Sequence, residues 1–210
     1  MCAICGELVL DGSRPADRDL VRAMVARLRH RGPDDEGVVV DGPVALGAAR
    51  LSIIDVAGGH QPVSNEDGSV WIVFNGEIYN FREIKQSFPD HQFHSGSDTE
   101  VILKAFATHG NKCVHLFNGM FAFAIWDKSK KELFIARDRL GIKPLYYFHR
   151  DSLLVFASEI RALLASGLVP RKINGQAIAE YFTYQTVHAP ETIVENVQML
   201  MPGHFMTLSS

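Results

Sequence analysis

Residues 120–126 read Met-Phe-Ala-Phe-Ala-Ile-Trp, and this unbroken apolar run decides the fold. Successive side chains of a strand point to opposite faces of its sheet. The two phenylalanines and Ile125 therefore share one face, and the two alanines and Trp126 share the other. Because a strand with two apolar faces is covered on both sides, the run predicts a sheet with one layer above it and another below it.

Apolar segments on either side of this run predict further strands, with helices between them. Residues 2–10 predict a strand, and apolar residues at helical spacing over 20–28 predict a helix. A capping box of Asn80 and Glu83 is expected to open another helix. The other expected elements are a hairpin over 37–54, strands over 70–74, 133–136, 145–148 and 153–157, and helices near 98–110, 159–164 and 175–184. This order predicts stacked sheets beneath outer helices.

The composition is that of a folded protein. The chain has 210 residues, of which 47% are hydrophobic, and a formal net charge of −3. Burial of so many apolar residues offsets the entropy lost on ordering, and the length fits one domain. The balanced charge gives no basic footprint for nucleic acid, and no run reaches the ~18 apolar residues of a membrane span. We therefore expect no nucleic acid or membrane as partner, and the odd number of cysteines without a secretory signal predicts a cytoplasmic location.

Cys2 is the first candidate catalytic residue. If Met1 is removed, Cys2 carries both a thiol and a free α-amino group, whose pKa of ~7.7–8.0 suits it to accept the thiol proton. The small Ala3 leaves this end of the chain accessible. The alternative is a buried strand thiol without a catalytic role, and position alone favours that alternative.

Cys2 and Cys5 also form a C-x-x-C pattern, but the sequence supports neither chemistry that this pattern suggests. A zinc site needs four ligands, and the nearest histidine pair, His91 and His94, lies far along the chain. A redox pair is expected where a helix starts after a strand, whereas these cysteines lie within a predicted strand. We expect no metal in this domain.

Asn75-Gly76 is the second candidate, at the end of an apolar strand. Asn75 offers a side-chain amide donor and Gly76 a backbone N–H without a side chain, and both donor types can stabilise a developing oxyanion. The alternative is an ordinary Asn-Gly turn between two strands, which is the commoner meaning of this dipeptide.

Two charged residues could bind a zwitterionic substrate. Arg50 lies among small and apolar neighbours, where a guanidinium needs a carboxylate partner. Asp98 lies at a predicted helix start and could accept an ammonium group. The alternatives, a structural salt bridge for Arg50 and a helix N-cap for Asp98, are each favoured when the residues are taken singly. Lys143 and its charged neighbours 137–139 are interpreted as turn and ion-pair residues.

Eight ordered segments together resemble the glutamine amidotransferase domain of glutamine-hydrolysing asparagine synthetases, which are of the N-terminal nucleophile type (class II). They are residues 1–2, 29–34, 50–55, 74–80, 97–103, 119–124, 137–146 and 157–160. The resemblance implies an α+β fold, a four-layer αββα sandwich of the N-terminal nucleophile hydrolase type. Ala3 departs from the pattern, because many relatives carry glycine there, and we interpret this added methyl group as a mild change.

The resemblance also implies roles for individual residues. Cys2 would attack the side-chain amide of L-glutamine to form a thioester, with Asn75 and Gly76 as the oxyanion hole. Arg50 would hold the α-carboxylate of the substrate. The substrate-binding set is implied to be Arg50, Ile53, Ile54, Asn75, Gly76, Glu77 and Asp98, in which Glu77 and Asp98 bind the α-amino group and backbone groups of the isoleucines complete the pocket.

The function implied is hydrolysis of glutamine to glutamate and ammonia, which a following synthetase domain uses for ATP-dependent asparagine synthesis from aspartate. We expect residues 1–210 to be the amidotransferase domain alone, with the synthetase domain absent from this chain and acting in cis or in trans. ATP and Mg are expected only for that absent domain, and no cofactor for this one. A homodimer is possible. The alternatives are an amidotransferase domain that feeds another acceptor, and a non-catalytic amino-acid-binding module of the same fold.

Overall fold

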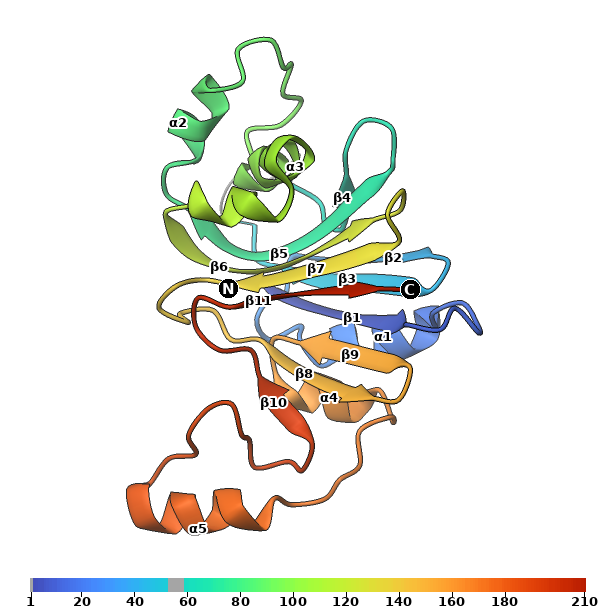
Figure 1. The fold of residues 1–210 in the computed structure, drawn as a ribbon, viewed down its shortest axis with the longest axis vertical. Helices are drawn as coiled ribbons and strands as arrows, with labels where there is room; N and C mark the ends of the chain where they lie inside the picture. The colour runs from blue at the N-terminus through green and yellow to red at the C-terminus, as the bar shows by residue number, and fades with distance from the viewer. Residues whose placement is uncertain (1, 53–58) are drawn as a thin grey trace.

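Two antiparallel β-sheets lie face to face in the computed structural model, which describes residues 2–52 and 59–210 (Figure 1). Across the first sheet the strands are β10 (Val197–Met199), β8 (Tyr146–Arg150), β9 (Leu153–Ala157), β1 (Ala3–Val9), β3 (Val44–Arg50) and β2 (Asp35–Asp41). Across the second they are β11 (Phe205–Ser209), β7 (Glu132–Arg137), β6 (Gly119–Asp127), β5 (Val70–Ile78) and β4 (Val63–Ser64).

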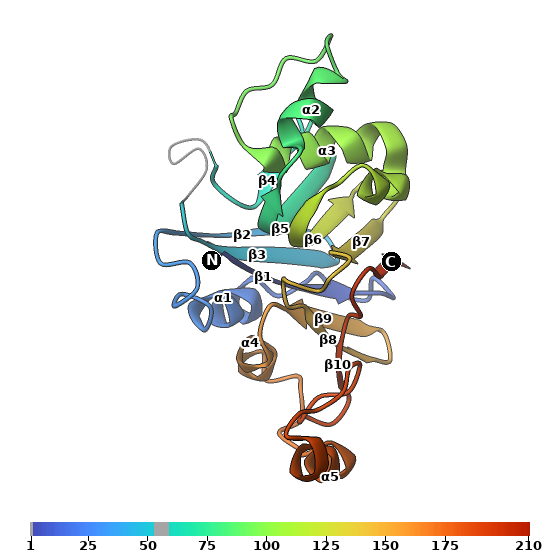
Figure 2. The ribbon, with the colours of Figure 1, turned by 90° about the vertical axis from the view of Figure 1, so that its left-hand side faces the viewer.

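Helices form the two outer layers (Figure 2). The first sheet is covered by α1 (Arg18–Ala26) and α4 (Ile160–Ala165). The second is covered by α3 (Asp98–His109), which continues into the 3₁₀ helix η1 (Gly110–His115) and packs against α2 (Phe81–Gln86). A last helix, α5 (Gly175–Tyr184), lies apart from both sheets in Figure 1, and Ala177 is its one buried residue. The result is the expected four-layer αββα sandwich.

Strand β6 has the two apolar faces that its sequence predicts. Phe121, Phe123 and Ile125 belong to the core between the second sheet and α3. The alanines and Trp126 belong to the core between the two sheets. The stacking of the sheets therefore follows from the alternation along β6, because each face has its own layer to pack against.

Strand β1 lies inside the first sheet, and all of its residues are buried. It pairs with β3 on one side, where Ala3 faces Ala49, and with β9 on the other, where Cys5 faces Ala157. This register brings Cys2, just before β1, to the end of β3 that carries Arg50.

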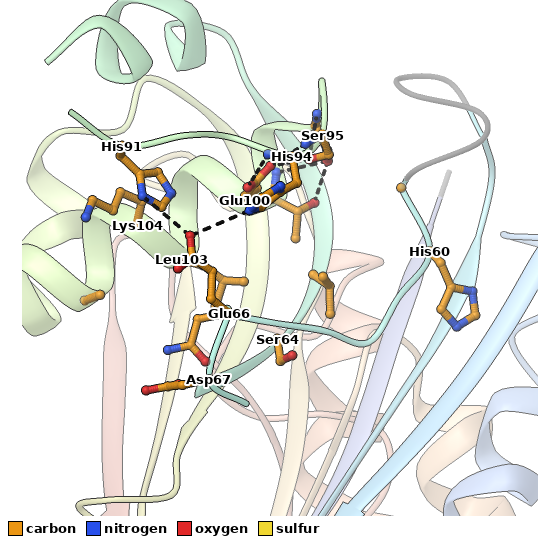
Figure 3. A pocket seen from close by; sticks show the side chains of 16 residues that line it. His60, Ser64, Glu66, Asp67, His91, His94, Ser95, Glu100, Leu103 and Lys104 are labelled. Atoms are coloured by element: carbon orange, nitrogen blue, oxygen red, sulfur yellow. Dashed lines mark hydrogen bonds and ion pairs between the residues drawn. The ribbon is translucent and has the colours of Figure 1, made fainter. Parts of the chain in front are cut away.

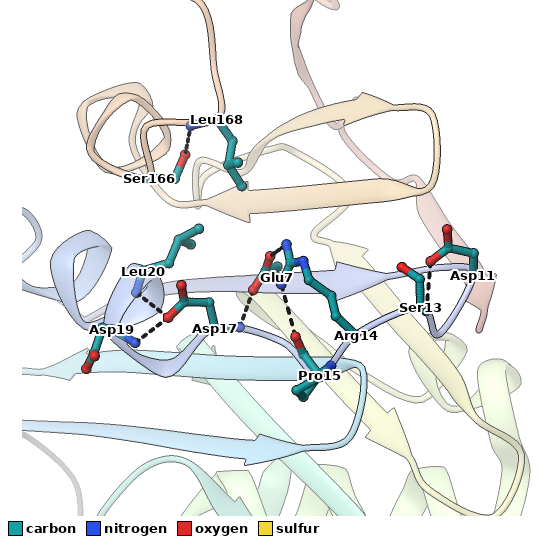
Figure 4. Close-up of polar contacts among 10 residues, drawn as sticks. All are labelled: Glu7, Asp11, Ser13, Arg14, Pro15, Asp17, Asp19, Leu20, Ser166 and Leu168. Carbon is teal, nitrogen blue, oxygen red and sulfur yellow. Dashed lines mark hydrogen bonds and ion pairs between the residues drawn. The ribbon is translucent and has the colours of Figure 1, made fainter.

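The buried carboxylate of Glu7 ties the segment after β1 to that strand (Figure 4). Its Oε1 accepts from Nη2 of Arg14 at 2.6 Å, and its Oε2 accepts from the backbone N–H of Asp17 at 2.6 Å. Asp17 in turn caps α1 through the N–H groups of Asp19 and Leu20. A charge buried in a core strand thus fixes where the first helix begins.

Two local interpretations are wrong. The expected strand over 70–74 is present, but β5 runs on to Ile78, so Asn75-Gly76 lies inside a strand and is not a turn. The short helix after Asn80 exists, but without the capping box. Instead, the Asn80 amide binds across to the chain before β6, where it accepts from Asn118 N at 2.9 Å and donates to Leu116 O at 3.0 Å.

No helix in the described part of the chain has the length and apolarity needed to cross a membrane. The three cysteines are free thiols. Within residues 2–52 and 59–210, no group of three or more His, Cys, Asp or Glu side chains is arranged to hold a metal ion.

Candidate active site

Cys2 lies just before β1, and both its thiol and its carbonyl oxygen form hydrogen bonds. It is partly buried, and Sγ donates to the carbonyl oxygen of Leu51 at 3.6 Å. Its own carbonyl oxygen accepts from Nε of Arg31 at 3.2 Å. Cys5, by contrast, is fully buried in the core beneath α1, and burial raises the pKa of its thiol. The two cysteines of the C-x-x-C pattern therefore occupy different environments, and only Cys2 reaches the surface.

Asn75 lies buried in β5 opposite Ala122 of β6 and is 1% exposed. Neither Nδ2 nor Oδ1 finds a hydrogen-bond partner among the described residues. An unpaired buried polar group costs ~1–3 kcal/mol, so most such groups in proteins are paired. This amide is therefore available to bind a polar group that is not part of the protein.

Gly76 follows in β5, where only glycine fits. A Cβ built on it would lie 2.8 Å from Cα of Phe121 and still closer to the carbonyl oxygen of Met120, both in β6. The strands can approach this closely because the side chain is absent. The pair Asn75-Gly76 is thus fixed by strand pairing rather than by a turn.

Asp98 and Glu77 form an acidic end to this part of the site. Asp98 is 4% exposed, and its Oδ2 accepts from the backbone N–H of Ile78 at 2.9 Å. Burial, with a smaller contribution from the charge of Glu77, raises the pKa of Asp98 to about 6. The N-cap interpretation of Asp98 is wrong, because the Ser97 side chain caps α3 by accepting from Thr99 N at 3.2 Å.

Arg50 ends β3 beside Cys2, and it is buried. Its carbonyl oxygen accepts from Asp34 N at 3.0 Å, and the Asp34 carboxylate accepts from Ser52 N at 2.8 Å. These bonds hold the chain on which Arg50 and Leu51 lie. Ile53 and Ile54, the other expected substrate contacts, lie outside the described residues.

Three further charged residues lie around Cys2 without a predicted role in the site: Arg31, Glu159 and Lys143. Arg31 binds the Cys2 carbonyl and pairs with Glu159, 3.1 Å between Nη1 and Oε1. Lys143 is buried, and its pKa lies below the usual value for a lysine. Burial and the charge of Arg31 lower this pKa, and the opposing charges of Cys2, Asp138 and Glu77 offset the effect only in part. The interpretation of Lys143 as a turn residue therefore missed its position near Cys2.

A separate cavity of about 460 Å³ lies beside the start of α3, between that helix and the segments around β4 and before α3 (Figure 3). Its lining includes Glu66, His91, His94 and Glu100, and Glu66 Oε1 lies 3.7 Å from Nε2 of His94. Ser97 and Thr99 line it as well, but the intervening Asp98 binds β5 instead. None of the candidate catalytic residues lines this cavity, which is therefore distinct from the site at Cys2.

Comparison with known proteins identifies the family of this chain. The model of the glutamine amidotransferase domain matches residues 1–210. The chain belongs to this family. It is 38% identical over 216 residues to asparagine synthetase [glutamine-hydrolyzing] 2 of Bacillus subtilis, and the match covers all of this chain and 29% of that protein. It is 41% identical over 164 residues to the enzyme numbered 2 of Arabidopsis thaliana, which covers 78% of this chain and 28% of that protein.

A solved structure shares the fold of this amidotransferase domain. Glutamine phosphoribosylpyrophosphate amidotransferase from B. subtilis, complexed with ADP and GMP, superposes with a TM-score of 0.65 at 24% identity. The match covers 79% of this chain and 44% of that one. The expected N-terminal nucleophile fold is confirmed, and the chain spans about three tenths of the length of the two asparagine synthetases described above.

Proposed function

We propose that this domain hydrolyses the side-chain amide of L-glutamine to glutamate and ammonia through a thioester on Cys2. The observation that carries the proposal is the buried Asn75 amide, which has no partner among the described residues. A donor that is held rigid and unpaired suits an oxyanion, because it needs no reorganisation when charge develops.

The first half of the reaction uses groups of Cys2 and β5. After removal of Met1, the α-amino group of Cys2 accepts the thiol proton, and the thiolate attacks the amide carbon of glutamine. Nδ2 of Asn75 and the N–H of Gly76 bind the oxyanion of the tetrahedral intermediate. The ammonium group of Cys2 then returns its proton to the departing nitrogen, the C–N bond breaks, and ammonia leaves a thioester.

The second half regenerates the free thiol. The amine of Cys2 takes a proton from a water molecule, whose oxygen attacks the thioester carbon. The same two donors bind the second oxyanion. The C–S bond breaks, the thiolate recovers a proton, and glutamate is released.

Substrate selection rests on charge. We assign the α-carboxylate of glutamine to Arg50 and its ammonium to Glu77 and Asp98, with backbone groups of Ile53 and Ile54 as further contacts. Asp98 is suited to an ammonium because its carboxylate is buried, so that opposite charge is attracted strongly.

The acceptor of the ammonia is proposed from the relatives. They are named asparagine synthetases, and this chain spans only part of their length. We therefore propose that a synthetase domain, in cis or in trans, receives the ammonia and uses ATP and Mg to amidate aspartate. We place this reaction in the cytoplasm, and a homodimer is compatible with the proposal.

The decisive experiment combines ammonia release with intact mass. Protein with and without Met1 is incubated with glutamine, and separately with an electrophilic glutamine analogue. We expect ammonia release and a single label on Cys2 only in the molecules that lack Met1, and neither in Cys2→Ala. Glutamine binding without ammonia release from the processed protein would instead identify a non-catalytic binding module.

A further inference from the structure

We infer that Glu159 is a positioning residue for Cys2, acting through Arg31. This inference rests on the proposed function of Cys2, but the contacts that carry it are independent of substrate. They join three segments that are far apart in the sequence: the end of β9, the turn after α1, and the N-terminal residue before β1.

The backbone around Glu159 is fixed to the start of β1. Ser158, the residue before it, donates its N–H to the Ile4 carbonyl at 2.9 Å and accepts from Ile4 N through Oγ at 2.9 Å. Ser158 is fully buried. The backbone of Glu159 is thereby held beside the start of β1, the strand that follows Cys2.

Three basic side chains contact the carboxylate of Glu159. Oε1 lies 3.1 Å from Nη1 of Arg31 and 3.0 Å from Nε2 of His30, and Oε2 lies 3.0 Å from Nε of Arg161. Burial alone would raise the pKa of Glu159, but the hydrogen bonds from His30 and Arg31 hold it below its usual range. Glu159 is therefore an anion at neutral pH.

Arg31 depends on this anion for its orientation. Its side chain is 12% exposed, and Nη2 is buried without a partner among the described residues. Because the guanidinium is planar and rigid, the bond from Nη1 to Glu159 sets the direction in which Nε points. Nε points at the Cys2 carbonyl, 3.2 Å away. A nearly buried guanidinium without its carboxylate would also carry an uncompensated charge.

The position of the Cys2 carbonyl matters for catalysis because both reacting groups of Cys2 are bonded to the adjacent Cα. The amine and the Cβ–Sγ arm are attached to Cα, so the orientation of the carbonyl plane limits where each can lie. An error of ~1 Å in placing a reacting group costs up to about 10²-fold in rate. Glu159 itself contacts none of these groups and so acts only by holding Arg31.

The test compares Glu159→Gln with a matched control, Glu36→Gln. Glu36 receives two bonds from Arg29, at 2.7 and 2.8 Å, in an exposed pair close to Arg31 along the chain. Each substitution removes the negative charge of a carboxylate that pairs with an arginine. We expect Glu159→Gln to lower kcat for glutamine hydrolysis by about tenfold or more with little change in KM, whereas Glu36→Gln leaves both unchanged. Equal kcat in the wild type and Glu159→Gln would overturn the inference.

A double-substitution cycle separates positioning from general stability. If Glu159 acts only through Arg31, the protein with both Arg31→Gln and Glu159→Gln has the same kcat as Arg31→Gln alone. Multiplicative losses in the double variant would refute the route through Arg31. If Glu159→Gln does not fold, the same cycle is run with Glu159→Asp, whose carboxylate keeps the charge but is one methylene further from Arg31.

Alkylation of Cys2 gives a readout that does not need turnover. Cys5 and Cys113 are buried, and burial raises the pKa of both thiols, so we expect iodoacetamide to modify Cys2 selectively. In processed protein we expect slower alkylation of Cys2 in Glu159→Gln than in the wild type or Glu36→Gln. Wild-type protein that releases no ammonia would count against the proposed function alone, and an unchanged alkylation rate in Glu159→Gln against the positioning role alone.

Discussion

Replacement of Asn75 by alanine should separate catalysis from stability. The amide is 1% exposed and unpaired among the described residues, so its burial already costs ~1–3 kcal/mol. Alanine removes this cost together with the packing of the amide, and we expect the free energy of unfolding to change by no more than about 1 kcal/mol. Loss of one oxyanion donor should lower kcat by about 10²- to 10³-fold, or ~2.7–4 kcal/mol in the activation barrier.

The assay pairs ammonia release at saturating glutamine with denaturant unfolding, both on protein that lacks Met1. Asn80→Ala is the matched control, because the Asn80 amide is bonded to the backbone of Asn118 and Leu116. We expect the control to lose ~1–2 kcal/mol of stability and to keep its turnover. The two asparagines are only five residues apart, but we expect opposite results. Asn75→Ala should lose turnover and keep its stability, whereas Asn80→Ala should lose stability and keep its turnover.

Two results would refute this reasoning. Turnover of Asn75→Ala comparable to the wild type would remove Asn75 from the oxyanion hole. A loss of stability as large as that of Asn80→Ala would mean that the Asn75 amide is bonded in the folded protein, and the argument from its unpaired state would fail.

Three further predictions concern neighbouring residues. Burial raises the pKa of Asp98 to about 6, so its ionisation opposes folding as pH rises. In unfolding measurements across this range, Asp98→Asn should be more stable than the wild type above pH 6 and should lose this advantage near pH 4. Its KM for glutamine should also rise. Gly76→Ala should lower the thermal midpoint by forcing β5 from β6, with ~1–3 kcal/mol lost, and unchanged stability would disprove the close approach. Glu7→Ala should cost ~1–3 kcal/mol, because Asp17 N and the half-exposed guanidinium of Arg14 lose their bonds to the buried carboxylate, with kcat per folded molecule kept. An unchanged unfolding midpoint would contradict this role of Glu7.

The sequence was sufficient for features that depend on periodicity. The alternation along residues 120–126 predicted both faces of β6, since each face packs on its own layer. The pair Asn75-Gly76 was harder, because the dipeptide favours a turn locally. Its place in β5 follows from nine residue pairs with β6, which override local preference and which no short window of sequence contains.

Contacts across long separations could not be predicted in this way. Arg31 and Glu159 are 128 residues apart, and each belongs to a segment whose own pattern indicates only a turn or a helix start. Lys143 likewise looked like a loop residue, although it is buried near Cys2. Burial of a charge is a property of the assembled fold, so it can be assigned only after the register of β1 with β3 and β9 is known.

Asn75 and Asp98 point to the same conclusion from different physics. The first is an uncharged amide that burial leaves without a partner, and the second is a carboxylate whose ionisation burial opposes. A core selected only for stability would carry apolar side chains at both positions, because each of these groups lowers the free energy of unfolding. One ligand relieves both costs, if it presents an oxygen to the amide and an ammonium to the carboxylate. Glutamine meets both requirements, since its carbonyl and its α-amino group lie at opposite ends of one short chain. The stability given up at these two positions is therefore recovered on binding, and that coupling favours an amino-acid amide over a ligand with only one of the two groups.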